Sequence, residues 1–193
     1  MEGMPVLTLR ALNLHWLGNT TDPAELCVHG TVYLAVGEQQ LLSSGVDELA
    51  VSTGALHLLR SLLADHTRDH PIAEQLIPCC GHAMSVDVST GQLSNIGCNV
   101  GANWWVIHQP VAGTVELQLP TGMAHRVRAS EWRAAVCAFN EDVAEFIAAS
   151  PARQPSSAED AEWYPVFLAE WSERRRAECG LTPVAADEAA NVL

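Results

Sequence analysis

The segment Leu26–Val36, LCVHGTVYLAV, decides the fold class, because its apolar side chains recur at every second residue. Such alternation is typical of a half-buried strand in an antiparallel sheet. Gly30 falls on the apolar face, where it predicts a bulge or a close approach of another backbone. The apolar face of this predicted strand carries Leu26, Val28, Val32, Leu34 and Val36.

The segments on either side of this strand also predict strands. Residues 5–17 alternate loosely, and turn signals follow at Gly18-Asn19 and Asp22-Pro23. Gly37-Glu38 suits a hairpin turn into residues 39–42, and residues 46–51 are a further candidate strand. The first fifty residues therefore predict an antiparallel meander.

Two later segments have the period of a helix. The first begins at Ser52 as its cap, carries a leucine stripe that includes Leu63, and closes before Pro71. The second begins at Ser130 and leaves Cys137 on its polar side as an exposed thiol. Its apolar stripe consists of Trp132, Ala135, Val136, Phe139, Val143, Phe146 and Ile147.

The last predicted helix starts near Tyr164, with Pro165 in its first turn, and ends before Gly180. The clearest hairpin lies earlier, where residues 113–120 and 123–129 flank Thr121-Gly122. Together these elements predict an α+β fold, in which an antiparallel β meander and hairpin form a sheet covered by about three helices. The sequence predicts that residues 1–150 form the domain, 151–158 a linker, 159–180 the helix packed on the domain, and 181–193 a disordered tail.

The charge of the chain limits its partners. The 193 residues include ten arginines and no lysine, and the formal net charge is −13. Such a surface repels phosphate backbones, which argues against nucleic acid and favours a basic partner. No apolar run approaches the ~20 residues of a membrane helix, and the amino terminus carries no secretory signal. We therefore expect a cytoplasmic protein with six reduced cysteines and no membrane association.

Residues 76–108, LIPCCGHAMSVDVSTGQLSNIGCNVGANWWVIH, concentrate the side chains that can carry chemistry. Cys79 and His82 stand three residues apart, the reach of a turn that presents two zinc ligands, and Cys98 can close the site from a second loop. His66, His108 or a water molecule would be the fourth ligand. The alternative is a buried turn in which the cysteines act as small apolar residues.

Cys98 is also a candidate nucleophile, because Gly97 and Gly101 flank it on a predicted turn. Backbone N–H groups of such a turn can form an anion-binding nest, and His82 or His108 would act as the base. No cation lies near in sequence to lower the thiol pKa. A tight structural loop explains the same glycines.

A third interpretation of this stretch is recognition. Amide side chains beside amphipathic rings are typical of ligand clefts and protein interfaces. On a strand, neighbouring tryptophans face opposite sides of the sheet, so one of the two would lie outside the main core. The predicted ligand-binding residues are Asn99, Asn103, Trp104, Trp105 and His108.

These patterns predict a non-enzymatic protein that recognises a basic partner or a small ligand, in the manner of small inhibitor or immunity proteins. The alternative is a metal-binding protein, or a metal- or cysteine-dependent enzyme, with zinc held by Cys79, His82 and Cys98. His66 and His70 are four residues apart but are interpreted as solvated histidines at a helix end.

Overall fold

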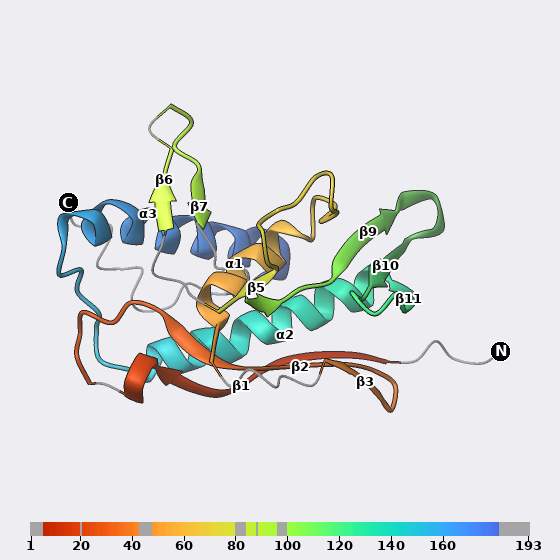
Figure 1. Ribbon diagram of the computed structural model, residues 1–193, viewed down its shortest axis with the longest axis horizontal. Coiled ribbons are helices and arrows are strands. Elements are labelled where there is room, and N and C mark those ends of the chain that lie inside the picture. Colours follow the sequence, from red (N-terminus) through yellow and green to blue (C-terminus); the bar gives the residue numbers. More distant parts are fainter. Residues whose placement is uncertain are drawn as a thin grey trace.

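The computed structural model describes residues 6–19, 21–42, 48–79, 84–87, 89–95 and 100–181 (Figure 1). These residues form antiparallel sheets and three α-helices, which confirms the predicted α+β fold class. The predicted hairpin joins a sheet of its own and does not extend the meander. Among the described residues, every helix is too short or too polar to cross a lipid bilayer.

The first sheet is the predicted meander, with strands in the order β1-β2-β3 and β4 paired to β2. Its central strand β2 (Val28–Val36) pairs antiparallel with β1 (Leu7–Trp16), β3 (Gln39–Leu42) and β4 (Leu49–Ala50). The β1–β2 register shifts between Leu12 and His15, opposite Gly30. A Cβ on Gly30 would lie 2.7 Å from the Leu12 carbonyl oxygen, which confirms the predicted close approach.

The second sheet consists of β9 (Trp105–Gln109), β10 (Thr114–Gln118) and β11 (Ala124–Arg128). A short 3₁₀ turn, η2 (Pro110–Ala112), connects β9 to β10. Two further pairs complete the described strands: β5 (Ile77–Pro78) with β8 (Gly101–Ala102), and β6 (Met84–Val86) with β7 (Leu93–Asn95). The β6–β7 hairpin stands away from the body above α3 (Figure 1).

Helix α1 (Val51–Arg60) lies at the centre of the molecule, and every residue from Val51 to Leu59 is buried. It begins one residue before Ser52, whose hydroxyl accepts a hydrogen bond from Val28 N in place of capping the helix. It ends at Arg60, eleven residues before Pro71, because the Ser61 hydroxyl donates to the Leu58 carbonyl at 2.6 Å and closes the last turn. The helix is therefore shorter than the sequence predicts, and Leu63 is exposed.

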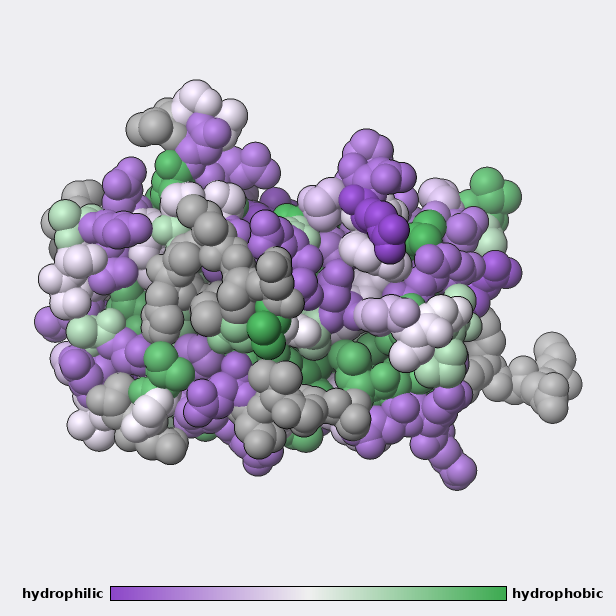
Figure 2. Space-filling view, in the orientation of Figure 1, coloured by the Kyte–Doolittle hydropathy of each residue, from purple (hydrophilic) through white to green (hydrophobic). Residues whose placement is uncertain are grey.

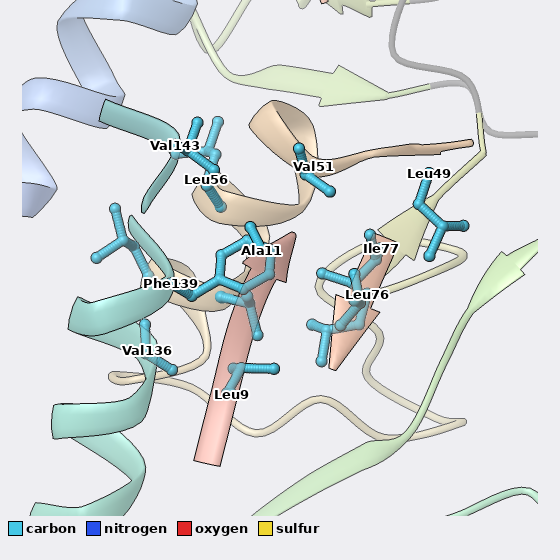
Figure 3. Packing of buried hydrophobic residues seen from close by; sticks show 14 of the residues in the cluster. Leu9, Ala11, Leu49, Val51, Leu56, Leu76, Ile77, Val136, Phe139 and Val143 are labelled. Atoms are coloured by element: carbon cyan, nitrogen blue, oxygen red, sulfur yellow. The ribbon is translucent and has the colours of Figure 1, made fainter. Parts of the chain in front are cut away.

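Helix α2 (Ala129–Ala148) packs its apolar stripe on β1 and α1. Its amino-terminal cap is Arg128 and not Ser130, since the Glu131 carboxylate accepts a hydrogen bond from Arg128 N at 3.1 Å. Phe139 points toward Ala11 of β1 and Leu56 of α1 (Figure 3). The stripe residues Trp132, Ala135, Val136, Phe139 and Val143 are all buried, as the sequence predicts.

Helix α3 (Ala158–Arg174) starts six residues before the predicted position, because the Ser157 hydroxyl caps it by accepting from Asp160 N at 3.0 Å. Pro165 thus lies inside the helix, where it has no N–H to donate. Three buried aromatic residues hold the helix on the domain across this point: Trp163, Phe167 and Trp171. A π-helical turn, η3 (Arg175–Cys179), follows and ends at Gly180, whose φ of 66° is the left-handed conformation of a helix terminator.

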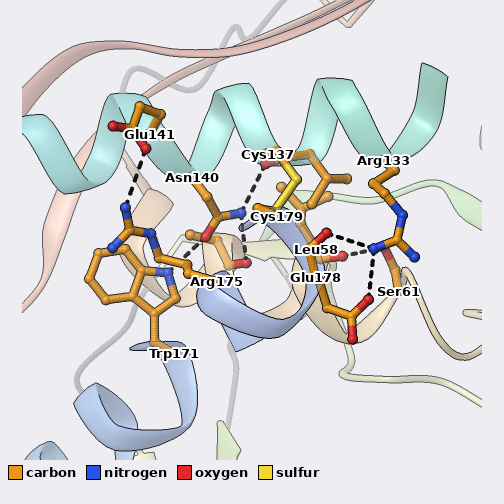
Figure 4. The surroundings of a disulfide bond; sticks show 12 residues. Leu58, Ser61, Arg133, Cys137, Asn140, Glu141, Trp171, Arg175, Glu178 and Cys179 are labelled. Atoms are coloured by element: carbon orange, nitrogen blue, oxygen red, sulfur yellow. Dashed lines mark hydrogen bonds and ion pairs between the residues drawn. A yellow bond between two sulfur atoms is a disulfide. The ribbon is translucent and has the colours of Figure 1, made fainter. Parts of the chain in front are cut away.

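The prediction of six reduced thiols is wrong. Cys137 forms a disulfide with Cys179, which joins α2 to η3 (Figure 4). Cys79 is also disulfide-bonded, and Cys27 is a buried thiol. Spacing on one helix could not show that Cys137 has a partner, because Cys179 reaches it only through the docking of α3.

We predict that Phe139→Ala lowers the free energy of unfolding by ~3–5 kcal/mol, because it removes a fully buried ring. Leu63→Ala, a control on the 63%-exposed residue of the predicted stripe, should cost less than ~0.5 kcal/mol. Urea unfolding of both variants measures the difference. Equal midpoints for Phe139→Ala and the wild type would contradict the packing of α2.

We also predict that the double variant Cys137→Ser/Cys179→Ser loses about 4 kcal/mol of stability, because the bridge closes a loop with a sequence separation of 42 residues. Urea unfolding measures this loss. Peptide mapping of the unreduced wild type should recover one cross-linked peptide that contains both cysteines. Two separate peptides from protein that was never exposed to a reductant would show that the bridge is absent.

Candidate functional site

A hollow of about 170 Å³ lies between strand β6 and the first turns of α3. The hairpin contributes Met84, Ser85 and Val86, and the helix contributes Glu159, Glu162 and Trp163. Hydrophilic residues, with a few hydrophobic ones among them, surround the base of this hairpin (Figure 2). The hollow therefore lies between a projecting hairpin and the negatively charged start of α3.

The acidic residues at the start of α3 have different roles. Asp160 is part of the local structure, because its carboxylate accepts from the Ser157 hydroxyl at 2.7 Å and from Trp163 Nε1 at 3.2 Å. Glu159 and Glu162 are exposed, and neither has an ion-pair partner among the described residues. Asp160 already complements the helix dipole, which leaves these two carboxylates available for another role.

The floor of the hollow is apolar. Met84 is 3% exposed and Trp163 is 2% exposed, so both belong to the core beneath the surface. Val86 is partly buried against the same core. An apolar floor with carboxylates at its rim matches the two parts of an arginine or lysine side chain, an apolar stem and a cationic head.

Most arginines of the protein are already ion-paired. Seven of the ten contact carboxylates, for example Arg10 with Asp142 and Arg60 with Glu170. Since few cations remain, internal ion pairs cannot neutralise the excess of acidic residues. The carboxylates at the hollow belong to this excess.

The structure describes four of the five predicted ligand-binding residues, Asn103, Trp104, Trp105 and His108. Trp104 is fully buried, and Asn103 Oδ1 is hydrogen-bonded both to His66 Nε2 at 2.9 Å and to Leu76 N at 3.0 Å. Trp105 is half-buried, with its ring centroid 5.2 Å from that of His66. Trp104 and Trp105 thus differ in burial, as their neighbouring positions predict.

His108 contacts a different residue, Asp65. Its backbone N and its Nδ1 each lie 2.8 Å from the same carboxylate oxygen, Asp65 Oδ1. These hydrogen bonds, the backbone one first, hold the pKa of Asp65 below its usual value. Asn99, the fifth predicted residue, lies outside the described residues.

His66 is not the solvated residue that the sequence predicts. It is fully buried, and Nδ1 accepts from Ile72 N at 3.0 Å, which leaves the proton on Nε2 to donate to Asn103. Burial lowers the pKa of His66, so it is held in the neutral form. The sequence marked His66 as a possible fourth zinc ligand and by its distance from His70, which is exposed, but gave no sign of the contact with Asn103.

His57 is a second buried histidine that sequence reasoning missed. It lies in α1, and its Nδ1 is 3.2 Å from the carbonyl oxygen of Leu76. Burial, followed by the charge of Arg60, lowers the pKa of His57 to about 4. His57 and His66 together fix the backbone of Leu76, one through its carbonyl and the other through Asn103.

The predicted zinc site loses one ligand. Cys79 is disulfide-bonded and has no thiolate to offer, whereas His82 and Cys98 lie outside the described residues. Within the described residues, no three His, Cys, Asp or Glu side chains are placed to hold a metal ion. Glu159 and Glu162 were not predicted as site residues, although two carboxylates three residues apart, next to Trp163, are visible in the sequence.

No protein-family model, curated protein or solved structure matches the chain.

We predict that stability falls by about 2 kcal/mol between about pH 7 and pH 5 because of His57. The unfolded chain takes up a proton below the ordinary histidine pKa of about 6.5, whereas the native state, with a pKa of about 4, resists protonation. The stability is thus fully present above about pH 6.5 and is lost as the pH falls. Urea unfolding of the wild type and of His57→Asn should show this loss in the wild type and a flatter dependence in the variant. Parallel pH profiles for the two proteins would contradict the assignment.

Proposed function

We propose that this protein binds a cationic segment of a partner protein, with an arginine or lysine side chain inserted between β6 and α3. The observation that supports this most directly is the hollow itself, where Glu159 and Glu162 stand without ion-pair partners, among the described residues, beside an apolar floor. A basic side chain would place its stem against Met84 and Trp163 and its head between the carboxylates. The protein is then a recognition protein and not an enzyme.

The spacing of the two glutamates supports a bound cation. Residues three apart lie on the same side of a helix, so the charges of Glu159 and Glu162 repel each other. A cation between them would turn that repulsion into attraction. Because both carboxylates are exposed, each ion pair contributes little by itself, about 0.5 kcal/mol. Specificity would then come from the apolar floor together with the two charges.

The net charge favours the same class of partner. A charge of −13 attracts basic proteins over distances near the Debye length and raises the rate of encounter. It also repels nucleic acids, so a basic protein is the partner that we propose.

The cytoplasmic localisation remains a prediction, and the Cys137–Cys179 bridge counts against it, because disulfides persist mainly in oxidising compartments. The alternative of a zinc or cysteine-dependent enzyme has no described residue in its favour, since Cys79 is disulfide-bonded.

The proposal predicts that a fluorescent hexa-arginine peptide binds the full chain. The double variant Glu159→Gln/Glu162→Gln should weaken this binding about five-fold, because it removes two exposed ion pairs of about 0.5 kcal/mol each. Fluorescence anisotropy at low and physiological salt measures the affinity. A hexa-citrulline peptide, which has nearly the same shape without the charge, should bind far more weakly.

A matched control distinguishes peptide binding at the hollow from peptide binding caused by the overall negative charge. Glu38→Gln/Glu48→Gln removes the same charge from exposed positions that lie elsewhere on the chain. This control should leave the affinity for hexa-arginine within about two-fold of the wild-type value. That change is smaller than the loss of one exposed ion pair at the hollow would cause. If both double variants weaken binding equally, only net charge is acting, and the hollow is not the site.

A further inference from the structure

The outer edge of strand β7, in the hairpin that projects above α3 (Figure 1), is closed by an arginine. Arg60 Nη2 donates to the Leu93 carbonyl oxygen at 3.0 Å. The same guanidinium is held by the Glu170 carboxylate of α3 at 2.8 and 2.6 Å. The Leu93 carbonyl therefore points away from β6, and a further strand could add beside β7 only by displacing this contact.

The outer edge of strand β6 is open at Val86. In an antiparallel pair, neighbouring residues of one strand direct their N–H and C=O groups to opposite edges. Asp87 N donates to the Gln92 carbonyl on the β7 side at 2.9 Å, so the N–H and C=O groups of Val86 face away from β7. The pairing of Val86 with Leu93 gives the same direction. Among the described residues, neither backbone group of Val86 has a hydrogen-bond partner.

This open edge belongs to the wall of the acidic hollow. Val86 lines the hollow from the hairpin, and Glu159 and Glu162 line it from α3. Met84 points its backbone in the same direction but is only 3% exposed, whereas Val86 is half-buried. Val86 is therefore the residue of this edge that another chain can reach. Strand β6 also carries neither a charge nor a proline, the two features by which proteins commonly block an exposed edge.

A strand that pairs with this edge would direct one of its side chains into the hollow. Residues directly opposite each other in an antiparallel pair lie on the same face of the sheet. The partner residue opposite Val86 would thus point its side chain as Val86 does, toward the core beneath the hairpin. Its two neighbours would point to the opposite face, with the exposed Ser85. One partner residue can therefore supply both the backbone hydrogen bonds to Val86 and the cation for Glu159 and Glu162.

We propose that the cationic segment binds as an extended strand that adds to β6, with its arginine or lysine opposite Val86. This inference rests on the proposed function, because it describes how the basic partner occupies the same hollow. In strand addition, main-chain hydrogen bonds provide affinity and the pocket for a side chain provides specificity. A hairpin of two strands is by itself only marginally stable, so a third strand would also stabilise β6 and β7.

The test uses the full chain and a capped fluorescent hexapeptide, Arg-Thr-Arg-Thr-Arg-Thr, with two N-methylated forms of equal charge. Methyl groups on the three arginines remove the N–H groups that would face Val86. Methyl groups on the three threonines remove the N–H groups that would face away from it. Fluorescence anisotropy should show binding about ten-fold weaker for the first form, in the range of a lost backbone hydrogen bond, and within about three-fold of the parent for the second.

The outcomes distinguish this inference from the proposed function. Equal affinities of the two methylated peptides would overturn the added strand. If hexa-arginine still loses affinity in Glu159→Gln/Glu162→Gln, the cation site itself stands in that case. Failure of the hexapeptide and of hexa-arginine to bind would overturn both proposals.

The amide protons of β6 report on the added strand directly. The Val86 N–H gains an acceptor only when the peptide pairs with this edge, whereas the Asp87 N–H is already bonded to Gln92. Saturation with the hexapeptide should move the Val86 amide proton resonance downfield and slow its exchange with solvent, and should leave both properties of Asp87 nearly unchanged. A Val86 amide that changes no more than that of Asp87 would contradict strand addition.

A pair of variants at Val86 removes the donor from the protein side. Val86→Pro removes an N–H that faces the open edge, a position where proline is tolerated, whereas Val86→Ala keeps this N–H. Both variants lose the packing of the valine side chain. The hexapeptide should therefore bind about five-fold more weakly to Val86→Pro than to Val86→Ala, from the loss of one hydrogen bond. Equal affinities of these two variants would show that the partner does not pair with β6.

Discussion

The three helices depend on one buried amide. Asn140 of α2 is fully buried (Figure 4). Its Nδ2 donates to the Ala55 carbonyl of α1 at 3.3 Å and to the Val136 carbonyl at 3.0 Å. Its Oδ1 accepts a hydrogen bond from Trp171 Nε1 of α3 at 2.7 Å. A buried polar group that loses a partner is destabilising, so the amide specifies one arrangement of the helices. Arg175 stacks over the same Trp171 ring and reaches Glu141, and Cys137–Cys179 closes this contact from the other side.

The elements that the sequence predicts well are those in which one face is buried. The alternation in β2, the β10–β11 hairpin and the stripe of α2 all appear in the structure, because burial requires that period. The boundaries differ where a single hydroxyl decides them. Ser61 ends α1 and Ser157 begins α3, and neither role follows from hydrophobic periodicity. Local hydrogen bonds compete with the helix at both places.

The candidate sites were harder to predict, because they depend on which segments meet. Asp65 and His108 are 43 residues apart in sequence, and Glu162 meets Met84 only because the β6–β7 hairpin packs on α3. The sequence drew attention to His108 but not to Asp65, and it treated Cys137 as a thiol without a partner. Residue types and spacing indicate what a side chain can do, whereas only the packing shows which side chains act together.

The central position of α1 also determines the order in which the protein can fold. This helix is made before two of the surfaces that bury it, because α2 and α3 lie some eighty and a hundred residues later in the chain. Contacts of such long range are slow to form, since chain entropy is lost before they contribute. A nascent chain that lacks α3 exposes the apolar surface of α1, and such surfaces are recognised by chaperones and prone to aggregation. The burial of α1 is therefore complete only after α3 has been made.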